Sequence, residues 1–196
     1  LRASSPCLGA YPCAAAAKQI VAAARLLLKR HVAGRGTKMA RRAAWLLFLL
    51  AGGDPAHPRE FWLDPIRIMK GLFLAQMERD DAAPTPVVNA AFEFVPYSYG
   101  PFAPMIYAEL DSLRASGLAI NAQVYGKSYR LWALSSPAGW EAARTAAQEL
   151  TDDERARIRH AHEIVTSKSF NDLLQYVYRR YPDSASRSMH EAARQS

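Results

Sequence analysis

The segment from residue 92 to residue 134 constrains the fold most, because it holds two secondary-structure signals in a fixed order. The Gly100-Pro101 step predicts the start of a helix, and Gly117 suits its left-handed C-cap. Apolar residues that alternate on both sides of Gly126-Lys127-Ser128 predict a two-stranded hairpin after it. A helix followed by a β-hairpin is how the core of a winged helix-turn-helix is built.

The segments around this unit supply further helices. Residues 41–51 read as a core helix that ends at Gly52-Gly53, with a signal peptide over residues 39–53 as the alternative. Asp64-Pro65 begins a helix so apolar that it must be largely buried, with a narrow polar stripe. Phe92 and Phe94 alternate with Glu93, as in a half-buried strand. The polar stripe of the helix that begins at Asp64-Pro65 consists of Arg67, Lys70, Gly71 and Glu78.

After residue 134 the pattern is helical. Ser135-Ser136-Pro137 is expected to cap one helix, and Thr151-Asp152-Asp153-Glu154 is a capping box for the next. Ser169 begins a helix that stops at Tyr181-Pro182. The predicted class is mainly α with a small β-hairpin, a winged helix-turn-helix with a C-terminal helical extension. We divide the chain into a leader (1–38), a winged-helix core (39–134) and C-terminal helices (135–196) that pack on the core or dimerise.

The excess of basic over acidic residues in this chain comes entirely from the leader. The net charge is +7, from 25 basic and 18 acidic residues. Residues 1–38 hold seven of the basic residues and no acid, which leaves 18 of each sign in residues 39–196. The predicted core therefore lacks the basic excess that is typical of a nucleic-acid-binding domain.

The leader also differs in composition, because it is rich in Ala and precedes the first methionine, Met39. We expect it to be disordered or absent from the native protein. Two alternatives are a basic amphipathic targeting helix over 20–30 and a nucleic-acid-binding arm. Cys7 and Cys13 have no neighbouring histidine and the wrong spacing for a zinc site, so no metal is expected there.

The predicted helix after Gly100-Pro101 has an informative polar face. A DNA reader would show several Arg, Lys, Asn or Gln side chains there. This face offers one arginine and one aspartate among small and aromatic groups, which favours a protein partner. The expected partner-binding residues are Pro104, Tyr107, Ala108, Asp111 and Arg114.

The hairpin tip gives the opposite indication, because its side chains suit phosphate and sugar contacts. An ordinary solvated hairpin with cross-strand aromatic pairs explains the same residues equally well. Both interpretations stay open. The expected nucleic-acid-binding residues are Tyr125, Lys127, Tyr129 and Arg130.

Three sets of side chains need a structural explanation. Glu109 lies close to the apolar helix face and is expected to pair with Arg67 or Lys70, or to sit at the core edge. His160 and His162 are two residues apart, so they diverge around a helix and are expected on the polar surface. The third set forms either a core face or a surface for stacking and phosphate, and the core face is favoured: Tyr176, Tyr178, Arg179, Arg180 and Tyr181.

The sequence contains no phosphate-binding loop, dinucleotide fold signature, HExxH or GxSxG motif. We therefore expect a non-enzymatic protein without a cofactor. No apolar run reaches the roughly 18 residues of a membrane span. A cytoplasmic protein is expected, because residues 39–196 contain no cysteine.

Residues 69–77, the Tyr99-Gly100-Pro101 step and residues 106–113 together resemble the Panacea-type (SocA-like) antitoxin domains and the small YwgA-like bacterial proteins. The resemblance covers residues 64–134. It implies a bacterial, non-enzymatic protein that binds a partner protein, a promoter or both. The predicted function is thus an antitoxin-like or adaptor-like winged-helix module that binds a protein, and the alternative is a DNA-binding transcriptional regulator.

Overall fold

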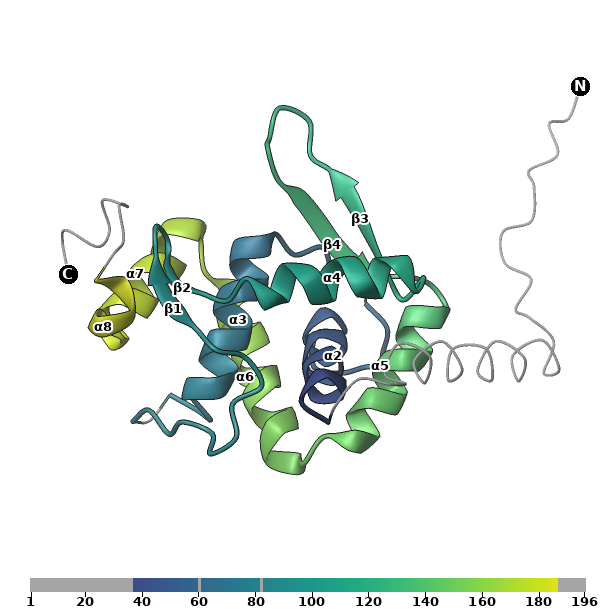
Figure 1. Cartoon of the computed structure of the whole chain (residues 1–196), viewed down its shortest axis with the longest axis horizontal. Coiled ribbons are helices and arrows are strands. Elements are labelled where there is room, and N and C mark those ends of the chain that lie inside the picture. Colours follow the sequence, from purple (N-terminus) through teal and green to yellow (C-terminus); the bar gives the residue numbers. More distant parts are fainter. Residues whose placement is uncertain (1–36, 60, 82, 187–196) are drawn as a thin grey trace, which may run out of the picture.

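The computed structural model describes residues 37–59, 61–81 and 83–186, which form helices and two small antiparallel sheets (Figure 1). The prediction of a mainly helical chain with a small hairpin is confirmed. The predicted leader lies outside the described residues, except for the start of α2. The elements are α2 (Thr37–Leu50), α3 (Pro65–Met77), β1 (Val95–Tyr97), β2 (Gly100–Phe102), α4 (Met105–Ala115), β3 (Ala119–Gln123), β4 (Arg130–Leu134), α5 (Ala138–Glu149), α6 (Asp152–Ser167), α7 (Phe170–Arg180) and α8 (Pro182–Ala185).

Helix α2 is the centre of the core, as the sequence predicts. Every residue from 43 to 51 is buried, and α3, α5 and α6 surround the helix (Figure 1). The helix stops because Gly52 and Gly53 both adopt positive φ, where the Gly53 amide donates to the Phe48 carbonyl. No helix in the described part of the chain is both long enough and apolar enough to cross a membrane.

Helix α3 packs along α6 and carries the predicted N-cap. The Asp64 carboxylate accepts from the Arg67 amide, and Pro65 occupies the first helical turn. The prediction that this helix is largely buried is confirmed, and the burial extends to Lys70 and Glu78 of the polar stripe. The chain that covers them comes from β2 and α7, which are distant in sequence.

The structure corrects the start of the helix after Gly100-Pro101. These residues belong to β2, which pairs with β1 in a tight hairpin, and α4 begins only at Met105. Gly100 has φ of +82°, which a right-handed helix cannot accommodate. The predicted strand at Phe92 and Phe94 also lies too early, since β1 spans 95–97.

The second hairpin, β3–β4, extends away from the helices (Figure 1). Its turn is where the sequence predicts it, and Gly126 has positive φ. The inner half of β4 is buried, whereas Ile120 in β3 is exposed. An isolated antiparallel bridge between Leu63 and Trp132 ties the segment before α3 to this hairpin.

The C-terminal helices pack on this core. Thr151 and Glu154 form the predicted capping box of α6, with both reciprocal hydrogen bonds present. The predicted Ser cap of α5 differs, because Pro137 holds the N-cap position and the Ser135 hydroxyl accepts from the Gly139 amide. Helix α7 begins at its predicted Ser169 cap.

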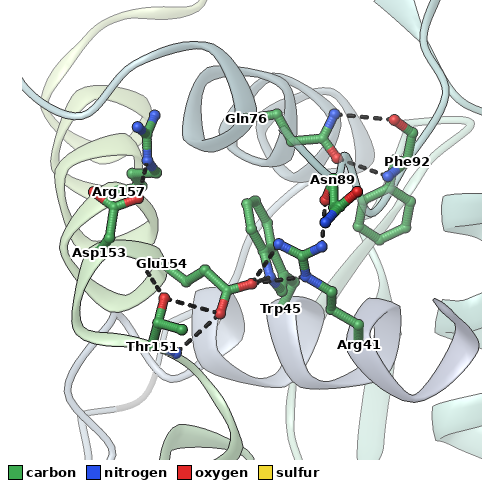
Figure 2. A network of polar contacts seen from close by, with 9 residues as sticks. All are labelled: Arg41, Trp45, Gln76, Asn89, Phe92, Thr151, Asp153, Glu154 and Arg157. Carbon is green, nitrogen blue, oxygen red and sulfur yellow. Dashed lines mark hydrogen bonds and ion pairs between the residues drawn. The ribbon is translucent and has the colours of Figure 1, made fainter. Parts of the chain in front are cut away.

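Figure 2 shows a polar network that fixes the long connection between α3 and β1. The Gln76 side chain donates to the Phe92 carbonyl at 2.9 Å and accepts from its amide at 2.6 Å. The Glu154 carboxylate accepts from Trp45 at 2.9 Å and pairs with Arg41 at 2.7 Å. Burial alone would raise the pKa of Glu154, but these contacts and the Thr151 amide outweigh it and lower the pKa.

Candidate functional site

A cavity of about 420 Å³ lies between the first half of α3, the β1–β2 hairpin, the start of α4, the start of α7 and residues 128–129 in the turn of the second hairpin. We call it the aromatic cavity, because ring side chains dominate its wall. Its size falls in the range of small-ligand pockets, roughly 300–1,000 Å³. The aromatic residues that line it are Tyr97, Tyr99, Phe102, Tyr107, Tyr129 and Phe170.

Helix α3 supplies the polar end of the aromatic cavity. Asp64, Met69 and Lys70 line this wall. The Asp64 carboxylate is already engaged, because it caps α3 and pairs with the Arg67 guanidinium at 3.2 Å. The Met69 sulfur accepts from the Ala103 amide at 3.2 Å. The Lys70 amine has three N–H donors, which leaves capacity for a further partner beyond its hydrogen bond to β2.

Strand β2 holds that amine in place. The Lys70 Nζ donates to the Pro101 carbonyl at 3.0 Å. The strand can approach this closely because residue 100 is glycine: an added Cβ would lie 2.8 Å from the Tyr178 ring and 3.6 Å from Nζ. Residues 69–77 and the Tyr99-Gly100-Pro101 step therefore meet at this hydrogen bond.

The surroundings disfavour a charged amine. Lys70 is only 2% exposed, and no carboxylate among the described residues lies within ion-pair distance of its amine. Burial lowers the pKa of Lys70 from 10.5 to about 7. At neutral pH the amine is therefore close to half-protonated and takes up a proton readily when an anion approaches.

The rim of the aromatic cavity is solvent-exposed. Tyr97 is 55% exposed and its ring stacks on Phe102 at 4.8 Å, while Tyr107 and Tyr129 are each 41% exposed. Burial, and then the Asp64 carboxylate, raise the pKa of Tyr107. Exposed aromatic side chains grouped around a hollow are typical of binding surfaces.

The predicted partner-binding residues on α4 are all exposed, and Arg114 lies 3.9 Å from Asp111 across one helical turn. Of this set, Tyr107 alone lines the aromatic cavity. The predicted nucleic-acid-binding residues at the hairpin are also all exposed, and Tyr129 alone reaches the cavity. The structure therefore joins the two predicted sets through Tyr107 and Tyr129.

Sequence reasoning missed most of this site. The sequence places Lys70 in a polar stripe, as a possible partner of Glu109, and it indicates no binding role for Tyr97, Tyr99 or Phe170. The available signal was one lysine in an otherwise apolar helix face, together with the tyrosines that flank Ser98. Neither signal shows that α3 and the β1–β2 hairpin touch.

Glu109 is buried as its position on α4 predicts. The two cations that were expected to pair with it have other partners. The Arg67 guanidinium pairs with Asp64 and donates to the Val165 and Lys168 carbonyls, and Lys70 donates to Pro101.

A second buried charge, Glu78, organises the opposite end of α3. Its carboxylate accepts from the Tyr181 hydroxyl at 2.6 Å and the Tyr176 hydroxyl at 2.8 Å, and lies 2.6 Å from the Arg180 guanidinium. Burial and the Glu78 carboxylate raise the pKa of both tyrosines. The preference for a core face over a stacking surface is confirmed for Tyr178 and Tyr181, which are buried, whereas Tyr176 and Arg180 are half-buried and Arg179 is exposed.

The expectation of surface histidines is wrong for His162, and His160 is half-buried. His162 is buried with its ring edge-on to Phe61 at 4.7 Å, and burial lowers the pKa of His162 to about 4. The His160 Nε2 lies 3.7 Å from Asp81 and 3.8 Å from Glu78. Among residues 37–186 that are described, no group of His, Cys, Asp and Glu is arranged to hold a metal ion.

Comparisons of this chain with protein-family models, with curated proteins and with solved structures found no match.

Proposed function

We propose that this chain is a winged-helix interaction module of the antitoxin or adaptor kind, without enzymatic activity, whose main partner is a protein. The observation that carries the proposal is the contiguous surface formed by Tyr97, Tyr107 and Tyr129 around the aromatic cavity. It joins the exposed face of α4 to the second hairpin. Exposed tyrosines anchor protein interfaces because each buries a large area at a small entropic cost.

The winged-helix part of the proposal is supported by the order of elements. Helix α2, the bridging residue Leu63, α3, α4 and the β3–β4 hairpin follow one another, and Leu63 pairs with Trp132 beside the hairpin. One feature departs from a DNA-reading helix-turn-helix, where a turn of three or four residues joins the two helices. Here residues 78–104 separate α3 from α4 and carry the β1–β2 hairpin.

Charge on α4 also favours a protein partner. Its exposed face pairs Asp111 with Arg114, so it presents no net charge to a phosphate backbone. A DNA-binding regulator is supported by a different observation, the exposed Lys127 and Arg130 on a hairpin that extends from the body (Figure 1).

The protein-partner proposal is tested by photo-crosslinking in the source cell. A photoreactive phenylalanine analogue replaces Tyr107, Tyr97 or, as the distant control, Val88, which is exposed on the connection between α3 and β1. We expect one protein to be crosslinked from both tyrosine positions and not from residue 88. Crosslinking to that protein should fall at least about tenfold when Asp111 and Arg114 are both replaced by alanine. Equal crosslinking from all three positions would contradict the proposal.

The DNA alternative is tested by fluorescence anisotropy of the full chain with duplex DNA over a salt series. A DNA-binding hairpin should lose affinity with salt at a slope of about one per phosphate contact. Replacing Lys127 and Arg130 with glutamate should abolish that binding. No binding at low salt would remove the alternative.

A further inference from the structure

We propose that the aromatic cavity is a ligand site for a carboxylate attached to an apolar or aromatic body, with the Lys70 ammonium as the group that pairs with the carboxylate. This inference does not rest on the proposed protein partner, although the cavity and the protein-binding surface share the rim residues Tyr97, Tyr107 and Tyr129. It assigns a ligand class to the cavity.

The first argument is the incomplete set of partners of the buried amine. A lysine ammonium has three N–H donors. The Lys70 Nζ donates to one acceptor among the described residues, the Pro101 carbonyl. A buried ammonium without an anion is unfavourable, so a ligand that supplies the anion gains the attraction that the fold leaves unused.

The second argument is the chemistry of the remaining wall. Ile66 and Met69 from α3 join the six aromatic side chains. The carboxylate that lines the wall, Asp64, already accepts from the first turn of α3 and pairs with Arg67. An apolar or aromatic ligand body therefore finds ring faces, while its carboxylate finds one available cation. A ligand with two or more charges would leave all but one of them unpaired.

The third argument is rigidity. Two hydrogen bonds, Lys70 to Pro101 and Ala103 to Met69, connect α3 to the chain around β2, and Gly100 lies against the Tyr178 ring. The amine is therefore positioned before a ligand arrives, which reduces the entropic cost of binding.

The charge state of the amine makes binding dependent on pH. The titratable groups that face Lys70 from the surrounding elements are Asp64 before α3, Tyr97 and Tyr99 of the first hairpin, Tyr107 of α4, Tyr129 of the second hairpin and Tyr178 of α7. A carboxylate binds the protonated amine, whose pKa in the free protein is about 7. Its Kd should rise about fivefold from pH 7 to pH 8, and by about tenfold for each further pH unit, because binding then requires proton uptake.

The test uses the full chain and isothermal titration with 4-phenylbutyrate, the neutral 4-phenylbutan-1-ol and acetate. We expect the acid to bind at least about tenfold more tightly than the alcohol at pH 6.5, and acetate to bind too weakly to measure. In Lys70→Met the acid should lose this advantage while the alcohol still binds. The matched control is Lys127→Met, which removes an exposed lysine at the hairpin tip and should change neither affinity.

A second pair of ligands distinguishes a free small molecule from the end of a polypeptide. A short peptide that ends in phenylalanine is titrated with a free and with an amidated C-terminus. Tighter binding of the free-acid peptide than of 4-phenylbutyrate, with loss in Lys70→Met, identifies a polypeptide C-terminus as the source of the carboxylate. Binding of 4-phenylbutyrate but not of the peptide identifies a free acid.

The inference is overturned if the wild-type chain binds acid and alcohol equally, if neither binds at millimolar concentration, or if the affinity for the acid is flat from pH 6.5 to pH 9. These three outcomes need no variant, so the test stands even if Lys70→Met fails to fold. The outcome is also separate from the photo-crosslinking result, because replacing Asp111 and Arg114 leaves every residue of the cavity wall unchanged.

Discussion

Lys70 in α3 and Glu78 at the C-cap of the same helix are buried ionisable groups of opposite type, yet their surroundings differ. The Glu78 carboxylate has two tyrosine hydroxyls and the Arg180 guanidinium as partners. The Lys70 amine has one backbone carbonyl and borders a cavity. A buried charge whose partners come from its own chain stabilises the fold, whereas one whose partners are incomplete marks a place for a ligand.

The largest effect is expected for Glu78→Gln. The change leaves the Arg180 guanidinium without its counter-charge, so the free energy of unfolding should fall by about 3–5 kcal/mol in urea titrations. Asp81→Asn is the matched control, because the Asp81 side chain is almost fully exposed and should cost less than about 0.5 kcal/mol. A tolerated Glu78→Gln would show that the Glu78 cluster is not structural.

Lys70→Met is expected to raise the free energy of unfolding, whereas Glu78→Gln lowers it. The pKa of Lys70 is 10.5 in the unfolded chain and about 7 in the folded chain, so between these values the unfolded chain binds more protons. Wild-type stability should therefore rise from pH 7 to pH 10.5 through this group. The methionine variant should be more stable by roughly 2–4 kcal/mol below pH 7, and this advantage should vanish above pH 10.5.

Urea unfolding of both proteins across this pH range measures the difference directly. For Lys127→Met, the difference in the free energy of unfolding from the wild type should not change with pH, since that lysine is exposed. A Lys70→Met variant that is less stable than the wild type at pH 6 would remove the contrast between the two buried charges.

A third buried ionisable group, His162, extends the comparison of Lys70 with Glu78. The fold buries His162 as the neutral ring. Its pKa is 6.5 unfolded and about 4 folded, so the unfolded chain binds more protons between these values and stability falls as pH drops from 6.5 to 4. This group should account for roughly 2–3 kcal/mol of the loss in the free energy of unfolding between pH 6.5 and pH 4. His162→Leu should lack that loss in urea or thermal unfolding. Phe61→Leu removes the ring contact but keeps the histidine, so its slope should persist.

The smallest effects concern the individual partners of Glu78. Tyr181→Phe and Tyr176→Phe each remove one hydroxyl donor to a buried carboxylate, at a cost of about 1–3 kcal/mol. The Tyr181 change should cost more, because its hydrogen bond is shorter and its side chain is more buried. Tyr125→Phe, at a fully exposed position, should be neutral. A larger loss for Tyr176 than for Tyr181 would reverse this order.

Local signals in the sequence predicted local structure well. The Asp64 cap, the Thr151–Glu154 capping box and the glycines after α2 depend on residues within about four positions, so one sequence window contains the whole interaction. The helix start predicted at Gly100-Pro101 was wrong for the converse reason, since α4 begins at Met105. Gly100 adopts a positive φ in a strand that lies against Tyr178, far away in sequence.

The candidate site shows the same division. Periodicity identified the exposed face of α4, because the angle between successive residues on a helix is fixed. It placed His160 and His162 on the surface and Lys70 and Glu78 in a polar stripe, because a polar residue within an element is normally exposed. The burial of Lys70 and Glu78 and the half-buried position of His160 depend on partners that the chain brings from about 30 to 100 residues away.

By itself the sequence determined where helices and turns form and that the body of the protein carries no net charge, because both depend on residue type and short-range spacing. The tertiary structure alone decided which polar side chains are buried and which of them border a cavity. Lys70 in α3 and Glu78 at its C-cap belong to the same polar stripe of the sequence. Only the packing of β2 and α7 against α3 gives one a cavity and the other a complete set of partners.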